Sequence, residues 1–285
     1  GRGGKGMNRL LDAFWRAAAY CLHPRVIVLS LAPLLLAGGM TLALGYFFWE
    51  PAVAGMRATL EGWALIDALL TWLEGLGGGG LRALIAPLVI VALALPAVVV
   101  LSLLLVALFM APALVSLVAK RRFADLEARR GAALWQSVLW SLGCTLLALL
   151  ALVLSIPLWF VPPLVLIVPP LIWGWLTYRV MAFDVLAEHA SAEERRTILR
   201  EHRWPLLAIG VITGYLGAAP TLLWALGAAA LIFAPLLVLV SVWLYTLVFA
   251  FAALWFAHYA LAALQQLRST NRPLAIQPIE ALPQP

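Results

Sequence analysis

The sequence predicts an all-α integral membrane protein made of long transmembrane helices and two helical hairpins. Its 285 residues are 65% hydrophobic and only 11% charged, against about 25% charged residues in an average soluble domain. Four stretches carry no charged residue at all: 26–49, 83–119, 131–178 and 204–267. Each of them exceeds the roughly 20 apolar residues that a helix needs to cross the hydrocarbon core of a bilayer. So few polar side chains cannot cover a water-facing surface.

The N-terminal part predicts a surface helix followed by the first span. Residues 1–6 precede the first methionine, and we expect them to be an addition left by cloning. Residues 7–22 place apolar side chains at helical spacing opposite charged ones, which predicts an amphipathic helix along the inner membrane face. The stretch 26–49 then predicts one span that begins near Pro24. We assign 7–267 to a single membrane domain and 268–285 to a Pro-rich cytoplasmic tail, expected to be disordered.

Residues 51–81 predict a short exported segment between the first two spans. Met56, Leu60, Trp63 and Leu70 are spaced for a helix at the membrane interface, and the glycine-rich run 75–80 ends it. The stretch 83–119 predicts one long span.

The two longest stretches predict helical hairpins, because each is too long for one helix and too short for three. In 131–178 the turn falls at the proline pairs 162–163 and 169–170, since a helix normally ends or kinks just before proline. The tip of this hairpin lies either at the far interface or in a packed, partly hydrated place within the membrane. In 204–267 we expect the turn at 217–220, which includes Pro220, and a kink at Pro235.

Basic residues mark the cytoplasmic segments of membrane proteins. Lys and Arg gather in the N-terminal segment, in 120–130, in 179–203 and after residue 267, whereas 50–82 holds only Arg57 and Arg82. We therefore expect both termini in the cytoplasm. The net charge of +6 follows from this distribution, and no nucleic-acid partner is needed to explain it.

Catalytic and metal-binding patterns are missing from the sequence. The four histidines, His23, His189, His202 and His258, stand in different segments without ligand spacing, and Cys21 and Cys144 fall in or beside spans. We therefore expect no enzyme, no metal site and no cofactor. His258 near the end of the last span is expected to be an interfacial or hydrogen-bonded histidine rather than a proton relay.

Two local motifs lie in the last third of the chain. Ser191 and Glu194 form a capping box that predicts a short charged helix running through Arg203, which we expect to be solvated. Gly210 and Gly214 have the spacing that lets two membrane helices approach closely. The close approach is either within one subunit or between subunits.

Two segments carry a resemblance to a known family. VALFMAPALVSLVAKRRFADLEARRG, in which Pro112 follows a predicted span and leads into a basic stretch, resembles a segment of the CysZ sulfate permease and etoposide-induced protein family. LIWGWLTYRVMAFDVLAEHASAEERRTILREHRWPLLAIGVITGYLGAAPTLLW resembles its second signature, and the likeness covers most of 7–267. It implies long spanning helices with hairpins that enter the bilayer partway, oligomeric assembly, and sulfate movement across the bacterial inner membrane. The expected partners are membrane lipids, a sulfate-like anion and further copies of the chain.

Asp184 matches an aspartate of that second signature, at the cytoplasmic exit of a predicted helix. We expect its carboxylate to pair with Arg179 or Arg203. At a hydrated interface such a pair is worth about 1 kcal/mol or less.

Family members that move sulfate tend to carry Pro-Gly-Leu-Arg-x-Phe-Val where the first span begins, with a second proline nine residues after the first. Pro24 and Pro33 keep that spacing, whereas Arg25 stands in the place of the glycine and Ile27 in the place of the arginine. Free N–H groups at the helix start and the Arg25 guanidinium predict an anion site at Arg25, Val26 and Ile27. Alternatively, Arg25 anchors the helix to lipid phosphates.

Two functions follow from these observations. One is an anion permease or channel for a sulfate-like substrate, either passive or proton-coupled. The other is a non-transporting membrane scaffold or envelope-biogenesis protein built on the same fold, which the scarcity of charge within the spans favours. Backbone groups at helix ends can bind an anion without such charges, which supports the first.

Overall fold

The computed structural model describes residues 2–220, 223 and 227–271, and every regular element in them is a helix, as predicted. Five helical segments are long and apolar enough to cross a membrane: Pro24–Glu61, Leu81–Arg122, Leu134–Phe160, Pro162–His189 and Ala234–Asn271. The chain is thus an all-α protein with several candidate spans, and the figures show how these are arranged.

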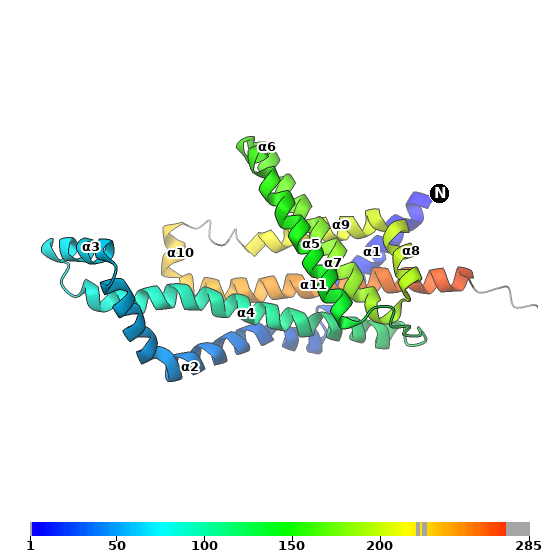
Figure 1. Ribbon diagram of the computed structural model, residues 1–285. Coiled ribbons are helices and arrows are strands. Elements are labelled where there is room, and N and C mark those ends of the chain that lie inside the picture. The colour runs from blue at the N-terminus through cyan, green and yellow to red at the C-terminus, as the bar shows by residue number, and fades with distance from the viewer. Residues whose placement is uncertain (1, 221–222, 224–226, 272–285) are drawn as a thin grey trace, which may run out of the picture.

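Three long helices form the body of the molecule. α4 (Leu81–Arg122) and α11 (Ala234–Asn271) lie along its long axis in Figure 1, as does the first part of α2 (Pro24–Glu61), which then bends away toward the next helix. α2, α4 and α11 contain 38, 42 and 38 residues, which at 1.5 Å per residue gives about 57 to 63 Å. Each is therefore longer than the roughly 30 Å of a hydrocarbon core, and the ends extend beyond it.

Prolines inside these helices do not end them. α2 continues through Pro33 and Pro51, and α4 continues through Pro112 for ten more residues to Arg122. The predicted long span 83–119 is therefore one continuous helix, and Pro112 lies within it rather than after it. Neighbouring helices and local adjustments satisfy the backbone groups that a membrane proline frees, and α4 packs against both α2 and α11.

The segment between the first two spans is shorter than predicted. Met56 and Leu60 belong to the end of α2, and only the following residues form a separate helix, α3 (Ala64–Gly75). The glycine-rich turn after α3 is confirmed, and Gly77 and Gly80 adopt positive φ angles of 96° and 91° there, which favour glycine.

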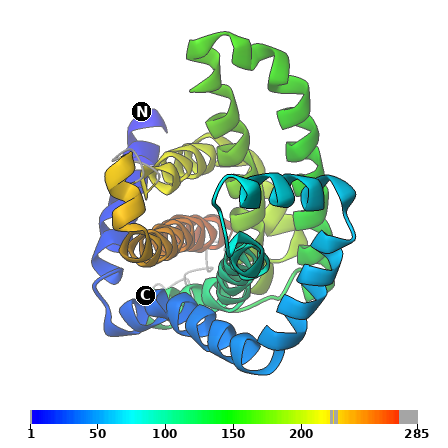
Figure 2. The ribbon, with the colours of Figure 1, turned by 90° about the vertical axis from the view of Figure 1, so that its left-hand side faces the viewer.

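The predicted hairpin at the two proline pairs is confirmed. α5 (Leu134–Ser155) leads through a 3-10 turn (Ile156–Phe160) and the short α6 (Pro162–Val165) into α7 (Val168–His189), which returns alongside α5. Each proline pair stands at a helix start, where the missing N–H is not needed. Figure 2 shows this hairpin (green) standing away from the long helices.

The second predicted hairpin consists of α9 (Arg203–Ala218) and α11, which lie in contact. α9 ends two residues before the buried Pro220, so the turn begins where expected. The turn also includes α10 (Ala228–Ile232), while 221–222 and 224–226 lie outside the described residues. Pro235 lies in the first turn of α11, and the chain changes direction directly before it, between α10 and α11 (Figure 1), so the expected bend at Pro235 is present as a break between two helices.

Two amphipathic helices cover the end where the hairpins open. α1 (Arg2–Tyr20) packs against α11. The indole N–H of Trp255 on α11 donates to the Leu10 carbonyl of α1 at 3.2 Å. α8 (Ala192–Glu201) follows α7. α11 itself extends to Asn271, so residues 268–271 of the predicted tail are helical, and 272–285 lie outside the described residues.

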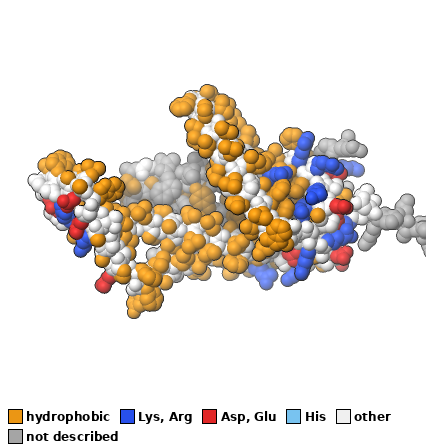
Figure 3. Space-filling model, in the orientation of Figure 1, with side chains coloured by type: hydrophobic (Ala, Val, Ile, Leu, Met, Phe, Trp, Pro, Cys, Tyr) orange, Lys and Arg blue, Asp and Glu red, His pale blue; other side chains and the backbone are white. Residues whose placement is uncertain are grey.

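Charge and packing divide the molecule along its length (Figure 3). Lys and Arg gather at one end, which we call the basic end and which comprises α1, residues 120–130, residues 179–203 and Arg268. A buried hydrophobic cluster also joins α1, α2, α4, α7, α8, α9 and α11 near this end. Toward the hairpin tips apolar side chains are exposed instead, and Phe160 is 86% exposed. Lipid or another subunit can cover such a surface, but water cannot do so favourably.

Candidate functional site

The predicted anion site lies at the start of α2, at the basic end. Pro24 is the first helical residue and His23 is the N-cap. Nδ1 of His23 accepts a hydrogen bond from the N–H of Arg25 at 3.2 Å. The N–H groups of Val26 and Ile27 both donate to the His23 carbonyl, at 3.0 and 3.1 Å. All three amides are engaged, so the expectation that they are free is wrong.

The Arg25 guanidinium is the part of this site that faces outward. Arg25 is exposed, and it makes no ion pair with any residue that the structure describes. Val26 is fully buried in the core and holds the helix start in place. The role of His23 as N-cap was not predicted from the sequence, because histidine is not among the preferred N-cap residues.

A polar contact ties the first turns of α2 to α11. Ser30 Oγ donates to the Ile27 carbonyl at 2.6 Å and accepts from the indole N–H of Trp243 at 3.2 Å. Ser30 and Pro33 are both buried. The predicted pair Pro24 and Pro33 thus brackets a helix segment that is fixed to α11 by a buried hydrogen bond.

A second polar centre joins α1, α4 and α11 around His258, which is 0% exposed. Arg122 lies 3.1 Å from Nδ1 of His258. A guanidinium only donates, so we assign Nδ1 as the acceptor and place the proton of the neutral ring on Nε2. Asp12 binds Arg122 at 3.2 Å, and Tyr20 stacks on the imidazole with ring centroids 4.6 Å apart. The prediction of a hydrogen-bonded histidine is confirmed.

Glu194 at the start of α8 is held by the end of α11. Arg268 Nε lies 2.8 Å from one Glu194 oxygen, and Arg129 lies 3.1 Å from the other. The same Arg268 guanidinium donates to the carbonyls of Glu127 and His189, both at 2.7 Å. One arginine therefore connects α11, the loop after α4 and the turn between α7 and α8.

The surroundings of Glu194 change its acidity. Burial acts to raise the pKa, but hydrogen bonds from Arg268 and Ser191 outweigh burial and lower the pKa of Glu194 to about 2. The capping box of Ser191 and Glu194 is confirmed, whereas the expected solvated helix is not: the helix ends at Glu201, and Arg195 and Ile198 are buried. Burial also lowers the pKa of Arg195.

Asp184 does not make the expected ion pair. It is exposed on α7, and neither Arg179 nor Arg203 lies within ion-pair distance of its carboxylate. The Arg179 guanidinium instead lies 4.5 Å from the ring centroid of Trp140 on α5 and 5.8 Å from that of Trp175. Contacts with two aromatic rings, which were not predicted from the sequence, thus take the place of the expected ion pair between Arg179 and Asp184.

The predicted glycine contact lies within the subunit. A Cβ on Gly210 would overlap the carbonyl oxygen of Gly174, and a Cβ on Gly174 would lie 2.7 Å from Val211 Cα. These residues join α9 to α7. Gly214 is less constrained, because its Cβ would meet its nearest neighbour at 3.8 Å. Gly210 was predicted from the sequence, but its partner Gly174 was not. Gly174 is the one glycine of α7, so no glycine spacing on that helix marks it as a contact residue.

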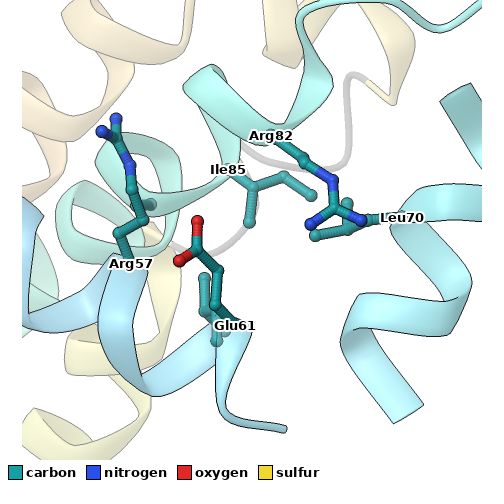
Figure 4. Close-up of a pocket in the computed structure, with 7 residues that line it drawn as sticks. Arg57, Glu61, Leu70, Arg82 and Ile85 are labelled. Carbon is teal, nitrogen blue, oxygen red and sulfur yellow. The ribbon is translucent and has the colours of Figure 1, made fainter. Parts of the chain in front are cut away.

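The opposite end of the molecule carries a small pocket between α2, α3 and α4 (Figure 4). Arg82 at its rim binds Asp67 at 2.6 Å and Glu74 at 2.8 Å, while Arg57 and Glu61 extend from α2. The cavity has a volume of about 10 Å³, which is room for about one water molecule and too little for a tetrahedral oxyanion. This far end is therefore a structural junction.

The site residues and the fold define a class of protein. Hairpins of apolar helices open at one basic end, and no group of three His, Cys, Asp or Glu in the described ranges could hold a metal ion. This is a multi-pass, all-α membrane protein.

Comparison with known families identifies the family. The family model described as Sulfate transporter CysZ/Etoposide-induced protein 2.4 matches residues 13–227, and the chain belongs to this family. The resemblance of the two sequence segments is thereby confirmed, and the family is one of transporters rather than enzymes. No curated protein and no solved structure matches the chain significantly.

Proposed function

We propose that the chain is a permease or channel for a sulfate-like anion in the bacterial inner membrane. The observation that carries this proposal is the family match over residues 13–227 of 285. The one-sided distribution of Lys and Arg (Figure 3) supports an orientation with both termini in the cytoplasm. The exposed apolar surface near the hairpin tips supports assembly into a homo-oligomer.

The proposed anion contact is the start of α2, with Arg25 as its main binding group. A guanidinium offers a fork of donors that matches two oxygens of an oxyanion. The N-terminal end of α2 adds a partial positive charge, although the amides of Arg25, Val26 and Ile27 already bind His23. The side chain, rather than the backbone, would therefore hold the anion. Transport is either passive or coupled to protons.

The second candidate is a membrane scaffold or envelope-biogenesis protein that transports nothing. The observation that favours it is the absence of charged residues from 83–119, 131–178 and 204–267, because ion pathways usually carry polar groups at membrane depth. Under this proposal Arg25 anchors α2 to lipid phosphates.

Titration calorimetry of the purified protein with sulfate tests the proposal. We expect Arg25→Ala to weaken sulfate binding at least tenfold, equivalent to about 1.4 kcal/mol, with unchanged oligomer size. Arg200→Ala is the control, because Arg200 is exposed at the same basic end on α8. Equal affinity in wild type and Arg25→Ala, or no sulfate binding in either, would remove this site and favour the scaffold.

A further inference from the structure

An apolar groove runs along the hairpin of α5 and α7. It has a volume of about 400 Å³ and is lined by Leu147, Ala151, Val168, Leu171, Ile172 and Trp175. This volume lies within the range of small-molecule sites, and the lining offers a ligand almost no hydrogen-bonding group. The groove therefore fits a hydrocarbon and not a free inorganic anion.

The groove leads to a cation. Val168, Leu171, Ile172 and Trp175 lie on one face of α7, and Arg179 continues this face one turn beyond Trp175, about 6 Å further along the helix. On α5, Trp140 lies seven residues before Leu147 and so on the same face. Its indole N–H donates to the Arg179 carbonyl at 2.8 Å. This bond joins α5 to α7 at the basic end of the groove, where the Arg179 guanidinium lies over the Trp140 ring.

Arg179 lacks an anionic partner within the described residues. Its side chain makes no hydrogen bond or ion pair there, and its Nε is buried without a partner. The rings of Trp140 and Trp175 stabilise the cation through their faces, at 4.5 and 5.8 Å, but a ring face is at best a weak acceptor for an N–H group. A partly buried guanidinium that is left without a hydrogen-bond acceptor is costly. An oxyanion from outside the chain would supply the missing hydrogen-bond acceptor to the Arg179 guanidinium.

We propose that this groove binds one anionic phospholipid, with an acyl chain against the apolar lining and the headgroup phosphate on Arg179. A single molecule with an apolar chain and a phosphate satisfies both halves of the site. Trp140 and Trp175 stand beside the guanidinium, and tryptophan is enriched at the boundary between hydrocarbon and headgroups in membrane proteins. A helix of a second subunit could fill the groove, but an apolar helix would leave Arg179 without an acceptor. The inference does not depend on sulfate transport.

Native mass spectrometry of the detergent-purified protein tests the site, with phosphatidylglycerol and phosphatidylcholine added at equal concentration. We expect the wild type to retain phosphatidylglycerol at least fivefold better than phosphatidylcholine. Arg179→Gln should abolish this preference. Ala151→Phe should fill the groove and lower retention of both lipids, although Arg179 is intact. Arg200→Gln, which removes an exposed charge from the same end, should change neither.

Several results would overturn the proposal. One is an undiminished preference for phosphatidylglycerol in Arg179→Gln. Another is displacement of the lipid by millimolar inorganic phosphate, which would indicate a site for a soluble anion. A third is an altered oligomer size in Ala151→Phe with unchanged lipid retention, which would make the groove a subunit interface. If Arg179→Gln fails to fold in lipid-free detergent, the Ala151→Phe result decides alone.

Discussion

Replacing Glu194 by glutamine removes one negative charge from the contact between α8 and α11 while preserving its shape. Glutamine still suits the third position of a capping box, so the bond to the Ser191 N–H is kept. What is lost is the ion pair to Arg268 at 2.8 Å and that to Arg129 at 3.1 Å. The substitution therefore separates charge from helix capping.

The pKa of Glu194 sets the size and the pH range of the effect. The pKa falls from 4.5 to about 2 in the folded protein, which corresponds to at most about 3 kcal/mol. The side chains of Glu194 and Arg268 are 11% and 15% exposed, and solvent screening reduces the expected loss to about 1–2 kcal/mol. Because the folded pKa is lowered, this stabilisation is complete above about pH 4.5 and is lost as the pH falls toward 2.

Thermal unfolding in detergent between pH 7 and pH 3 measures this contribution. We expect Glu194→Gln to lower the Tm by about 2–8 °C at pH 7 and the difference from wild type to shrink toward pH 3. Glu193→Gln is the matched control, because Glu193 is exposed in the same helical turn. Equal Tm values for wild type and Glu194→Gln at pH 7, or a difference that is as large at pH 3 as at pH 7, would refute this reasoning.

Three further predictions concern packing, an exposed carboxylate and topology. Gly210→Ala should lower the stability by about 1–3 kcal/mol without changing the number of subunits, because the added methyl group overpacks the contact with Gly174. Gly214→Ala should be tolerated, and equal losses of Tm in the two variants would contradict this. Asp184→Asn should change the stability by less than about 0.5 kcal/mol, since Asp184 is exposed, makes no ion pair with the described residues, and the amide oxygen of asparagine can still accept from the Ser137 side chain. A core-sized loss in Tm would contradict this. In a background without Cys21 and Cys144, a cysteine at Arg130 should react with a thiol reagent only from the cytoplasm and one at Gly79 only from outside, and the reverse pattern would exclude the proposed orientation.

Local signals in the sequence predicted the elements but not their lengths. The charge-free stretches and the proline pairs at 162–163 and 169–170 placed the α5–α7 hairpin correctly. Both signals are local, because a proline normally ends a helix at its own position and a charged residue marks the end of an apolar stretch directly. The interiors of α2 and α4 were harder, since Pro33, Pro51 and Pro112 stay within helices. Packing against neighbouring helices makes this possible, and a single sequence does not show that packing.

The sequence predicted individual residues of the candidate site but not the contacts that these residues make. Arg25 was identified from the helix start, whereas the partner of His258 is Arg122, 136 residues away, and the partner of Glu194 is Arg268, 74 residues away. Periodicity and capping rules describe neighbours along the chain. Contacts between distant helices depend on the tertiary arrangement, which explains why the pairing of Asp184 was predicted wrongly.

Sulfate flux into proteoliposomes tests the proposed function most directly. Purified protein is reconstituted and the uptake of radiolabelled sulfate is compared with that of protein-free liposomes. The permease proposal predicts uptake well above the protein-free rate, and a lower rate for Arg25→Ala at limiting sulfate than for Arg200→Ala. Uptake equal to that of protein-free liposomes, from protein that is folded and correctly assembled, would contradict transport and favour the scaffold.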